Sequence, residues 1–333
     1  MSSTAGAVAR WISPFLTVAT VVGLGCLTAP MQVRSVPEIR LVDAANPLAG
    51  QALYVNPDSA AMRAANGATP PSPELTAIAK TPQAYWMDQL STPAVDAKYI
   101  AAAQGAGTMP VLALYGIPHR DCGSFAAGGF SSAAAYRGWI DGTAAAIGGG
   151  PAAIILEPDA LAMADCLSAD QRQERFDLMS YAVDTLTRNP AAALYVDAGH
   201  SRWVNADDMA ARLNQVGVGK ARGFSLNTAN FFTTGEEIGY GDAISGLTNG
   251  AHYVVDTGRN GAGPVEGDPL YWCNPSGRAL GTPPTTDTGN GNIDAFLWVK
   301  RPGESDGSCG RGNPGAGRFV NQYAIDLAHN AGQ

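Results

Sequence analysis

The stretch Ala153-Ile-Ile-Leu-Glu-Pro-Asp159 shows the pattern on which most of this chain is built: an apolar run of strand length that ends abruptly in charged and turn-forming residues. Continuous apolar runs of this kind fit parallel strands that are buried on both faces of a sheet. The same pattern recurs along the chain. Six further runs lie at residues 52–55, 111–115, 193–196, 223–226, 252–255 and 295–299.

Helical patterns lie between these runs. Apolar side chains recur at helical spacing in each, and Ser168 with Gln171 forms a predicted capping box at the start of one. The predicted helices cover residues 131–147, 169–189, 207–216 and 318–330. Strand, loop and helix repeated about seven times predict a parallel α/β barrel. The carboxyl ends of the strands form the mouth of such a barrel, so the polar residues after each strand should converge in one cleft.

The composition narrows the classes of protein that remain. The chain has 333 residues, of which 46% are hydrophobic and 15% charged, and its formal net charge is −8. This acidic balance argues against binding to a nucleic-acid backbone, which requires a dense basic face. From about Asn46 onward the composition is even, without internal repeats or a linker. We therefore expect residues 43–333 to form a single catalytic domain.

The first 42 residues have a different character. No charged residue lies between Arg10 and Arg34, and the segment between them is apolar and contains small residues. This pattern predicts a secretory leader, with an uncleaved signal anchor as the alternative. Residues 1–42 are thus expected to be a leader or anchor followed by a short flexible segment, and the protein is expected to be extracellular.

Four cysteines follow the predicted leader. An even number in an exported chain predicts two disulfides, and three pairings would satisfy that prediction. Neither these cysteines nor the 4 histidines have the spacing of a metal site, so we expect no metal and no cofactor. The four residues are Cys122, Cys166, Cys273 and Cys309.

Acidic, amide and aromatic residues dominate the positions that follow the predicted strands. A cleft of this composition suits a polysaccharide, because sugar faces stack on rings, hydroxyl groups bond to polar side chains, and two carboxyl groups can flank a glycosidic bond. Several acids packed together also push their pKa values apart, which leaves one of them protonated near neutral pH. The residues are Tyr115, Asp121, Glu157, Asp159, Asp197, His200, Trp203, Asn227, Asn230, Asp256, Trp272, Lys300, Glu304 and Asp306.

Seven motifs contain nearly all of these residues and span most of the chain after the leader. They are Tyr115-Gly-Ile-Pro-His-Arg-Asp-Cys122, Ile155-Leu-Glu-Pro-Asp159, Tyr195-Val-Asp-Ala-Gly-His200, Gly223-Phe-Ser-Leu-Asn-Thr-Ala-Asn230, Val255-Asp-Thr-Gly-Arg-Asn-Gly261, Trp272-Cys-Asn274 and Leu297-Trp-Val-Lys-Arg-Pro-Gly-Glu-Ser-Asp-Gly307. In type and in order the motifs are similar to those of glycoside hydrolase family 6, the inverting cellulases. Together they make the resemblance highly specific.

The resemblance implies a distorted α/β barrel that cleaves β-1,4-glucan with inversion. By analogy, Asp159 is the general acid that protonates the leaving oxygen. Asp121 would raise the pKa of Asp159 and help to relay a proton from water, and Asp306 is another candidate for the base. Tyr115 would crowd the distorted sugar at the cleavage site.

The resemblance also implies which residues bind sugar and which cysteines pair. Cys122 would pair with Cys166 and Cys273 with Cys309, so that each bridge fixes a loop near a proposed acid. We expect the partner to be a β-1,4-glucan and the protein to be a monomer. The residues expected to contact sugar hydroxyls and faces are Lys300, Glu304, Trp272, Trp203, His200, Asn227, Asn230 and Asp197.

Two features bear on the kind of activity. Family members that work from chain ends roof the cleft with a long loop after the Glu-Ser-Asp-Gly motif, whereas residues 308–317 are all that separates this motif from the last helix, which favours an open cleft and an endoglucanase. The family also usually has a water-holding serine at the position of Ala127. Losing that hydroxyl would slow the reaction by ~10²–10⁴-fold. The alternatives are therefore a non-catalytic polysaccharide-binding protein or a hydrolase of another β-glucan.

Structural roles compete with functional ones at several carboxylates. Asp159 follows a strand, where an aspartate can simply cap the next helix. Asp197 and Asp256 could be structural partners of Arg202 or Arg259, because ion-pair networks also perturb carboxylates.

Similar alternatives apply to other side chains. His200 could orient a loop instead of touching sugar. We expect Trp86 and Trp298 to pack in the core or at the rim, whereas Trp272 should be exposed and stack on sugar. Glu236 and Glu237 are expected on a solvated face.

Overall fold

The computed structural model describes residues 45–332. The predicted leader, residues 1–42, lies outside the described residues. Within residues 45–332, no helix is both long enough and apolar enough to cross a membrane.

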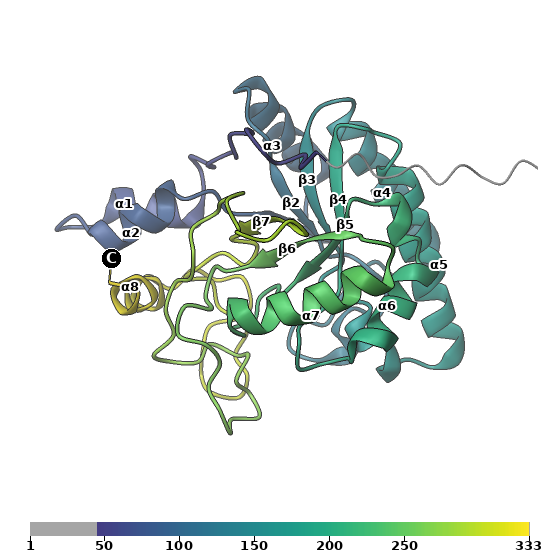
Figure 1. Cartoon of the computed structure of the whole chain (residues 1–333). Helices are drawn as coiled ribbons and strands as arrows, with labels where there is room; N and C mark the ends of the chain where they lie inside the picture. Colours follow the sequence, from purple (N-terminus) through teal and green to yellow (C-terminus); the bar gives the residue numbers. More distant parts are fainter. Residues whose placement is uncertain (1–44, 333) are drawn as a thin grey trace, which may run out of the picture. The chain divides into compact units, whose positions relative to one another are not determined.

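Seven parallel strands form the central sheet, and each pairs with its neighbours in sequence (Figure 1). They are β1 (Tyr85–Met87), β2 (Val111–Leu114), β3 (Ala152–Leu156), β4 (Ala192–Asp197), β5 (Gly223–Leu226), β6 (His252–Asp256) and β7 (Ile293–Leu297). The two edges meet through isolated bonds: the Ala84 N–H donates to the Trp298 carbonyl at 3.0 Å, and the Trp86 indole donates to the Val299 carbonyl at 2.8 Å. The predicted distorted barrel of about seven parallel strands is confirmed.

The first predicted strand was placed wrongly. Residues 52–55 form no strand, and Leu53 makes a single parallel bridge with Met109. Tyr54 packs edge-on against Tyr99 with ring centroids 5.3 Å apart. This apolar run is therefore half-buried against α3 (Pro93–Gly105), and the three-residue strand β1 occupies the sheet position expected for it.

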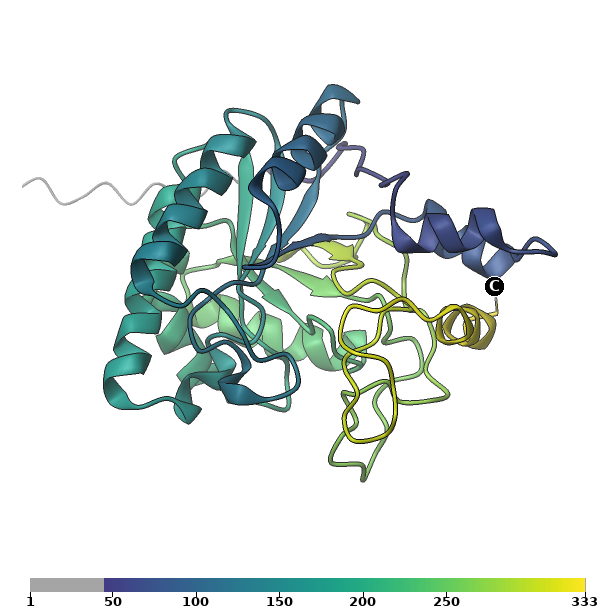
Figure 2. The ribbon, with the colours of Figure 1, turned by 180° about the vertical axis from the view of Figure 1, so that it is seen from behind.

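Helices follow most of the strands and cover the outer face of the sheet, as Figure 2 shows from behind. Four of them confirm the predicted helices at 131–147, 169–189, 207–216 and 318–330 to within a few residues. The capping box at Ser168 and Gln171 is also present. The helices are α1 (Ala60–Gly67), α2 (Pro73–Lys80), α3, α4 (Ala133–Ile147), α5 (Ala169–Leu186), α6 (Ala206–Gln215), α7 (Thr234–Leu247) and α8 (Asn321–Asn330).

Helix α7 was missed because glycines interrupt its pattern. It contains Gly235, Gly239, Gly241 and Gly246, each of which lowers intrinsic helix propensity. Tertiary packing explains one of them: a Cβ at Gly241 would lie 2.4 Å from the ring of Tyr253 on β6. Glycine there lets the helix lie close against the sheet.

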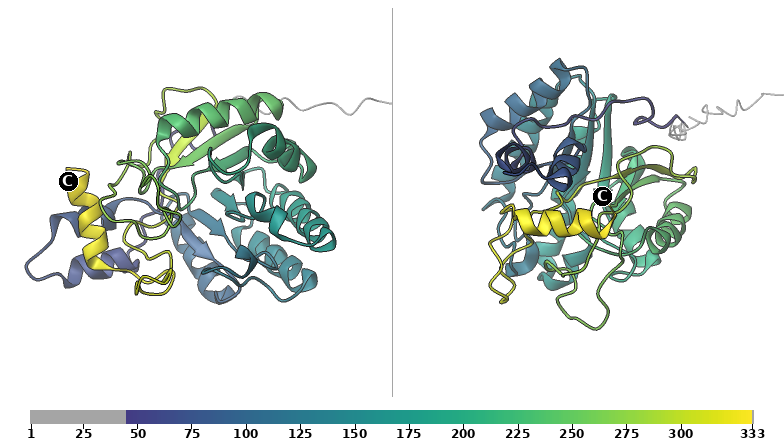
Figure 3. Two further views of the ribbon diagram at one scale, coloured as in Figure 1. Left: turned by 90° about the horizontal axis from the view of Figure 1, so that it is seen from below. Right: turned by 90° about the vertical axis from the view of Figure 1, so that its left-hand side faces the viewer.

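The apolar core consists of two layers, one on each face of the sheet, and a smaller separate cluster. Alternate residues of the strands pack outward against the helices, as Ile154 and Leu156 of β3 do. Their neighbours Ala153 and Ile155 point into the barrel, where many of the facing residues are small. A separate apolar cluster joins α1, α2 and α8, which lie side by side in both views of Figure 3.

Sharp backbone turns follow the strands at their carboxyl ends. Non-glycine residues with positive φ cluster there, including His119 (56°) and Asp121 (57°) after β2, Glu157 (52°) and Asp159 (69°) after β3, and Asn227 (65°) after β5. Such conformations are uncommon outside glycine and persist where surrounding contacts hold them. They cluster in the region where the sequence predicts a cleft.

Candidate active site

A cleft of about 610 Å³ lies where the residues that follow the strands come together. Nearly all of the predicted site residues line it, from loops after β2, β3, β4, β5 and β7 and from the long segment between β6 and β7. They are Tyr115, Asp121, Asp159, His200, Trp203, Asn230, Trp272, Lys300, Glu304 and Asp306. Asn227 and Asp197 do not line the cleft.

Asp159 has a carboxyl group without a hydrogen-bond partner among the described residues. Its backbone N–H donates to the Asp197 carboxylate at 3.0 Å. Burial raises the pKa of Asp159 well above its usual value, and the charges of Asp197 and Asp121 raise it further. It caps no helix, because the 3-10 helix Ala162–Cys166 that follows it has no side-chain cap and α5 is capped by Ser168. The raised pKa favours the protonated form of this side chain, and no other group among the described residues takes up its proton in a hydrogen bond.

Asp197 lies behind Asp159, at the end of β4. It is 1% exposed, and its carboxylate accepts bonds from the N–H groups of Asp159 and Gly199 and from the Ser225 hydroxyl, each at 3.0 Å. Burial raises its pKa to about 6, although these donors act in the opposite direction. Arg202 is not its partner, because that guanidinium pairs with Glu236 and Glu266 instead. Asp197 thus contacts the candidate acid and makes no contact with the cleft.

Asp121 lies in the tight turn that follows the β2 loop. Its carboxylate accepts a bond from the Ala126 N–H at 2.7 Å. Burial raises the pKa of Asp121, while that bond and Arg120 oppose the rise. A carboxylate with a raised pKa is a stronger base than an ordinary aspartate. Asp121 and Asp159 line the same cleft, as the sequence predicted.

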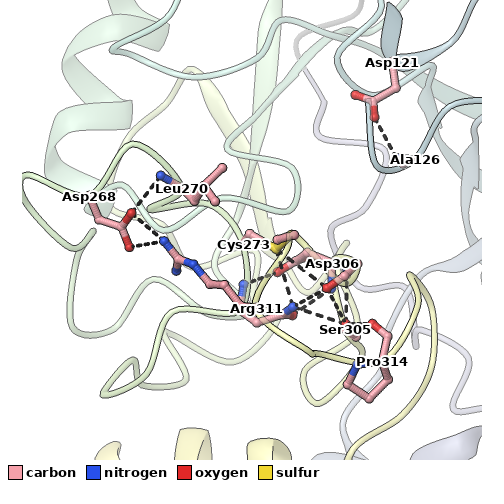
Figure 4. The surroundings of a disulfide bond; sticks show 12 residues. Asp121, Ala126, Asp268, Leu270, Cys273, Ser305, Asp306, Arg311 and Pro314 are labelled. Atoms are coloured by element: carbon pink, nitrogen blue, oxygen red, sulfur yellow. Dashed lines mark hydrogen bonds and ion pairs between the residues drawn. A yellow bond between two sulfur atoms is a disulfide. The ribbon is translucent and has the colours of Figure 1, made fainter. Parts of the chain in front are cut away.

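Two disulfides hold loops beside the cleft. Cys122 pairs with Cys166 and Cys273 with Cys309, which is the pairing that the resemblance implied. Figure 4 shows Asp306 beside Cys273, with Arg311 reaching Asp268 across the same loops at 2.6 Å.

Asp306 has surroundings opposite to those of Asp159. Its carboxylate pairs with Arg259 at 2.8 Å and Lys300 at 3.2 Å, and it accepts the Asn274 N–H at 3.0 Å. Burial alone would raise the pKa of Asp306, but Arg259 and Lys300 outweigh it and hold the pKa below its usual value. This carboxylate is therefore ionised when Asp159 is protonated.

Aromatic rings and a neutral histidine line the rest of the cleft. Trp203 is 40% exposed, and Trp272 is half-buried beside Phe125, with ring centroids 6.0 Å apart. His200 stacks on Phe232 at 4.2 Å, and burial lowers its pKa to about 3, so its ring is uncharged at neutral pH. Such rings can stack on sugar faces without a charge to repel or trap the ligand.

The family model described as glycosyl hydrolases family 6 matches residues 48–331, which is nearly the whole described chain. The chain belongs to glycoside hydrolase family 6. The predicted resemblance is confirmed.

Curated relatives that are 40–44% identical to this chain are named endoglucanases, whereas relatives that are 29–32% identical are named cellobiohydrolases or an exoglucanase. Endoglucanase A from Cellulomonas fimi is 44% identical over 284 residues, which are 84% of this chain and 61% of that protein. Endoglucanase 1 from Streptomyces halstedii is 41% identical over 289 residues, which are 83% of this chain and 88% of that protein. The chain thus spans about three fifths of the length of the Cellulomonas relative.

A solved family 6 structure shares the fold closely. The endoglucanase Cel6 from Mycobacterium tuberculosis, in complex with methyl-cellobiosyl-4-deoxy-4-thio-β-D-cellobioside, is 71% identical and has a TM-score of 0.85. The match covers 87% of this chain and 100% of that one.

Three polar residues that the motifs single out have structural contacts. Asn227 is fully buried, and its amide donates to the carbonyls of Phe232 and Asp256, so it is not free to bind sugar. The Asp256 carboxylate accepts backbone N–H groups, including that of Lys300 at 2.8 Å, and Arg259 pairs with Asp306 instead. These residues hold the loops of the family 6 cleft.

The surface prediction for Glu237 was wrong. Its side chain is 0% exposed and accepts the Ser201 N–H at 3.0 Å, which ties α7 to the loop that carries His200 and Trp203. Burial raises its pKa to about 7. The expectation that Trp298 packs in the core is confirmed, because it is 2% exposed.

Several cleft residues were not predicted as site residues. They come from long loops without strand or helix periodicity, where no sequence pattern indicates which side chains face inward. They include Leu90, Arg120, Ser124, Phe125, Arg202 and Tyr271. Among the described residues no cluster of three or more His, Cys, Asp or Glu side chains could hold a metal ion.

Proposed function

We propose that this chain is an inverting endo-β-1,4-glucanase that cleaves internal bonds of a cellulose-like β-glucan. One observation carries the proposal. The same cleft contains Asp159, whose pKa is raised well above its usual value by burial and neighbouring carboxylates, and Asp306, whose pKa Arg259 and Lys300 lower against the effect of burial. A cleft that favours the protonated form of one carboxyl group and the ionised form of another can supply the acid and base that cleavage of a glycosidic bond requires, and Asp121 in the same cleft is a further carboxyl group available for this chemistry.

In the proposed reaction, Asp159 donates its proton to the glycosidic oxygen as the bond to the leaving sugar breaks. A water molecule attacks the anomeric carbon from the opposite face, and its proton passes to Asp121. Asp121 suits this role better than Asp306, because burial raises the pKa of Asp121 whereas Arg259 and Lys300 occupy the Asp306 oxygens. Tyr115 lies in the cleft with Arg120 over its ring at 4.2 Å, so its orientation is held where it can crowd the sugar.

The polar and aromatic residues of the cleft are proposed to bind the sugar chain. Trp203 and Trp272 offer ring faces, and Lys300 and Glu304 offer groups for hydroxyls. The Asn230 side-chain oxygen is buried without a partner among the described residues, so a sugar hydroxyl would satisfy it.

An internal site of cleavage follows from the shape of the cleft. Residues 308–317 form a short loop that Cys309 and Arg311 tie down, so nothing in this segment is long enough to roof the cleft. Leu90 at the rim is 82% exposed. An open cleft admits the middle of a polymer, whereas a roofed one admits its ends.

We also propose that the protein works outside the cell and as a monomer. Two disulfides support the first point, because such bonds persist in oxidising compartments.

A second candidate function is polysaccharide binding without efficient turnover. It is favoured by Ala127, which lines the cleft with a methyl group where family members usually have a water-holding serine. Asp121, Asp159 and Asp306 argue against it, because a binding protein has no need of carboxyl groups with divergent pKa values.

The test follows the viscosity of carboxymethylcellulose and the release of reducing ends from it. It compares the full chain, its Asp159→Ala variant and an Asp207→Asn variant as the control. Asp207 is an exposed residue of α6 outside the cleft. Fast viscosity loss by the parent and the control, but not by Asp159→Ala, supports an endo-acting hydrolase. Binding without product release from any of the three overturns it in favour of the binding protein. If the protein cleaves only a different β-glucan, the proposed substrate is wrong and that β-glucan replaces it.

A further inference from the structure

Arg175 on α5 is a buried cation without a carboxylate partner in the described chain. The residue is 2% exposed, and none of the ion pairs among the described residues includes it. Burying a charge without an ion pair is costly unless its hydrogen bonds are well satisfied. The contacts of this guanidinium therefore need an explanation.

The guanidinium donates to backbone carbonyls of two separate loops. One terminal nitrogen bonds the Ala160 carbonyl at 3.1 Å, and the other bonds the carbonyls of Pro118 at 3.2 Å and His119 at 2.7 Å. Ala160 follows Asp159 directly, and His119 lies two residues before Asp121. The rigid planar fork of arginine can span both loops at once, which the single ammonium of lysine cannot do in the same geometry.

Both loops need such support. His119 has φ 56° and Asp159 has φ 69°, and backbone conformations of this kind persist only where surrounding contacts offset their strain. The loop after β2 is also held from its other side, because the fully buried Glu157 carboxylate accepts the N–H groups of Gly116 and Ile117 at 3.0 Å. Glu157, at the start of the loop after β3, thus joins the two loops near their strands, whereas Arg175 joins them from α5 at positions close to Asp159 and Asp121.

We propose that Arg175 is a positioning residue that sets the spacing between the Asp121 loop and the Asp159 loop. The inference rests on the proposed function, since the spacing matters only if both carboxyl groups act on one glycosidic bond. A displacement of about 1 Å at a reacting group can cost ~10²-fold in rate, so losing the fork should slow catalysis without removing the sugar-binding side chains.

The test compares Arg175→Lys and Arg175→Met with Arg172→Met in the full chain. Arg172 lies one turn earlier on α5, is exposed, and pairs with Asp165 at 3.5 Å outside the cleft. We measure kcat and KM on cellohexaose and on β-cellobiosyl fluoride, whose leaving group needs no proton. Both Arg175 variants should lose roughly 10–100-fold in kcat on cellohexaose, with KM within about twofold of the parent, and less on the fluoride. The Arg172 variant should match the parent.

Other outcomes overturn the inference. Parental kcat in a folded Arg175→Lys or Arg175→Met variant means that the loops keep their spacing without the fork. Equal losses on both substrates with a raised KM mean general damage to the cleft. If the Arg175 variants fail to fold, the residue serves stability and not positioning. An inactive parent and Arg172 control would instead contradict the proposed function.

Discussion

Asp159 and Asp306 are the same residue type in the same cleft, yet their surroundings differ in every respect that matters. The Asp159 carboxyl group has no hydrogen-bond donor among the described residues, and three other carboxylates, those of Asp197, Asp121 and Asp306, raise its pKa. Asp306 has two cations and a backbone N–H within 3.2 Å. Desolvation acts to raise the pKa of both groups, so it cannot by itself explain why one pKa rises and the other falls.

The comparison shows that charged neighbours decide the sign of a buried pKa shift. Burial disfavours the ionised form of both groups, and only Asp306 has partners strong enough to reverse that effect. The two carboxyl groups should therefore respond differently to the same substitution. Removing one should mainly change catalysis, and removing the other should mainly change stability.

The largest effect is expected from Asp159→Asn. An amide cannot donate a proton to the glycosidic oxygen, so kcat on cellohexaose should fall by ~10²–10⁴-fold while the affinity for sugar stays near that of the parent. Steady-state kinetics and calorimetric titration with cellohexaose measure the two quantities. A parallel loss of affinity would assign Asp159 a structural role and break the comparison.

A large loss of stability is expected from Asp306→Asn. The substitution leaves the buried Arg259 guanidinium without its carboxylate, which costs ~3–5 kcal/mol of unfolding free energy in comparable cases. Urea denaturation at neutral pH measures this loss of unfolding free energy. Asp159→Asn is the matched control, because the surroundings of Asp159 disfavour its ionised form and replacing it should not destabilise the protein. Equal destabilisation by both would mean that their surroundings do not differ energetically.

The same ion pair fixes a sign for the pH dependence of stability. Because the pKa of Asp306 is lower in the folded chain than in the unfolded one, its contribution is present above the unfolded pKa and is lost as the pH falls through the folded one. In urea denaturation at acidic pH, the difference between the parent and Asp306→Asn should therefore shrink. A constant difference down to pH values below the folded pKa would contradict the assigned shift.

A smaller effect is expected from Asp197→Asn. Asparagine retains an oxygen that can accept the Asp159 N–H but removes the charge that helps to raise the pKa of Asp159. Activity is lost as the pH rises through that pKa, so the alkaline limb of the kcat/KM profile should move to lower pH. Asp256→Asn, at a buried carboxylate that is not among the charges raising that pKa, should leave the limb in place. If the alkaline limb of the Asp197→Asn profile stays at the same pH or moves to higher pH, the Asp197 charge does not raise the pKa of Asp159.

The smallest effect is expected from Ala127→Ser. If an absent hydroxyl weakens the hold on the attacking water beside Asp121, restoring it should raise kcat by roughly a few-fold, well below the ~10²–10⁴-fold effect of a whole acid–base group. Ser124, which also lines the cleft in the same loop, offers a hydroxyl that limits the gain. An unchanged kcat in a folded variant would mean that the relay does not use this position.

Residues directly after the strands were predictable, and those in long loops were not. Asp121, Asp159 and Lys300 follow strands whose carboxyl ends must meet, so their convergence follows from parallel topology. Tyr271 and Phe125 line the same cleft from segments without periodicity. The run at 52–55 is apolar enough for a strand, but it lies half-buried outside the sheet, a placement that local sequence does not encode.

The sequence by itself determined the family, the parallel order of the strands and the set of polar residues at their ends, because each of these depends on local patterns and on their order. Only the tertiary structure decided which carboxyl group has a raised pKa, which residues line the cleft and which support them. Asp306 meets Arg259 from 47 positions away, and Arg175 reaches His119 from 56 positions away. Electrostatic and hydrogen-bond energies depend on such distances in space, which separation along the chain does not reveal.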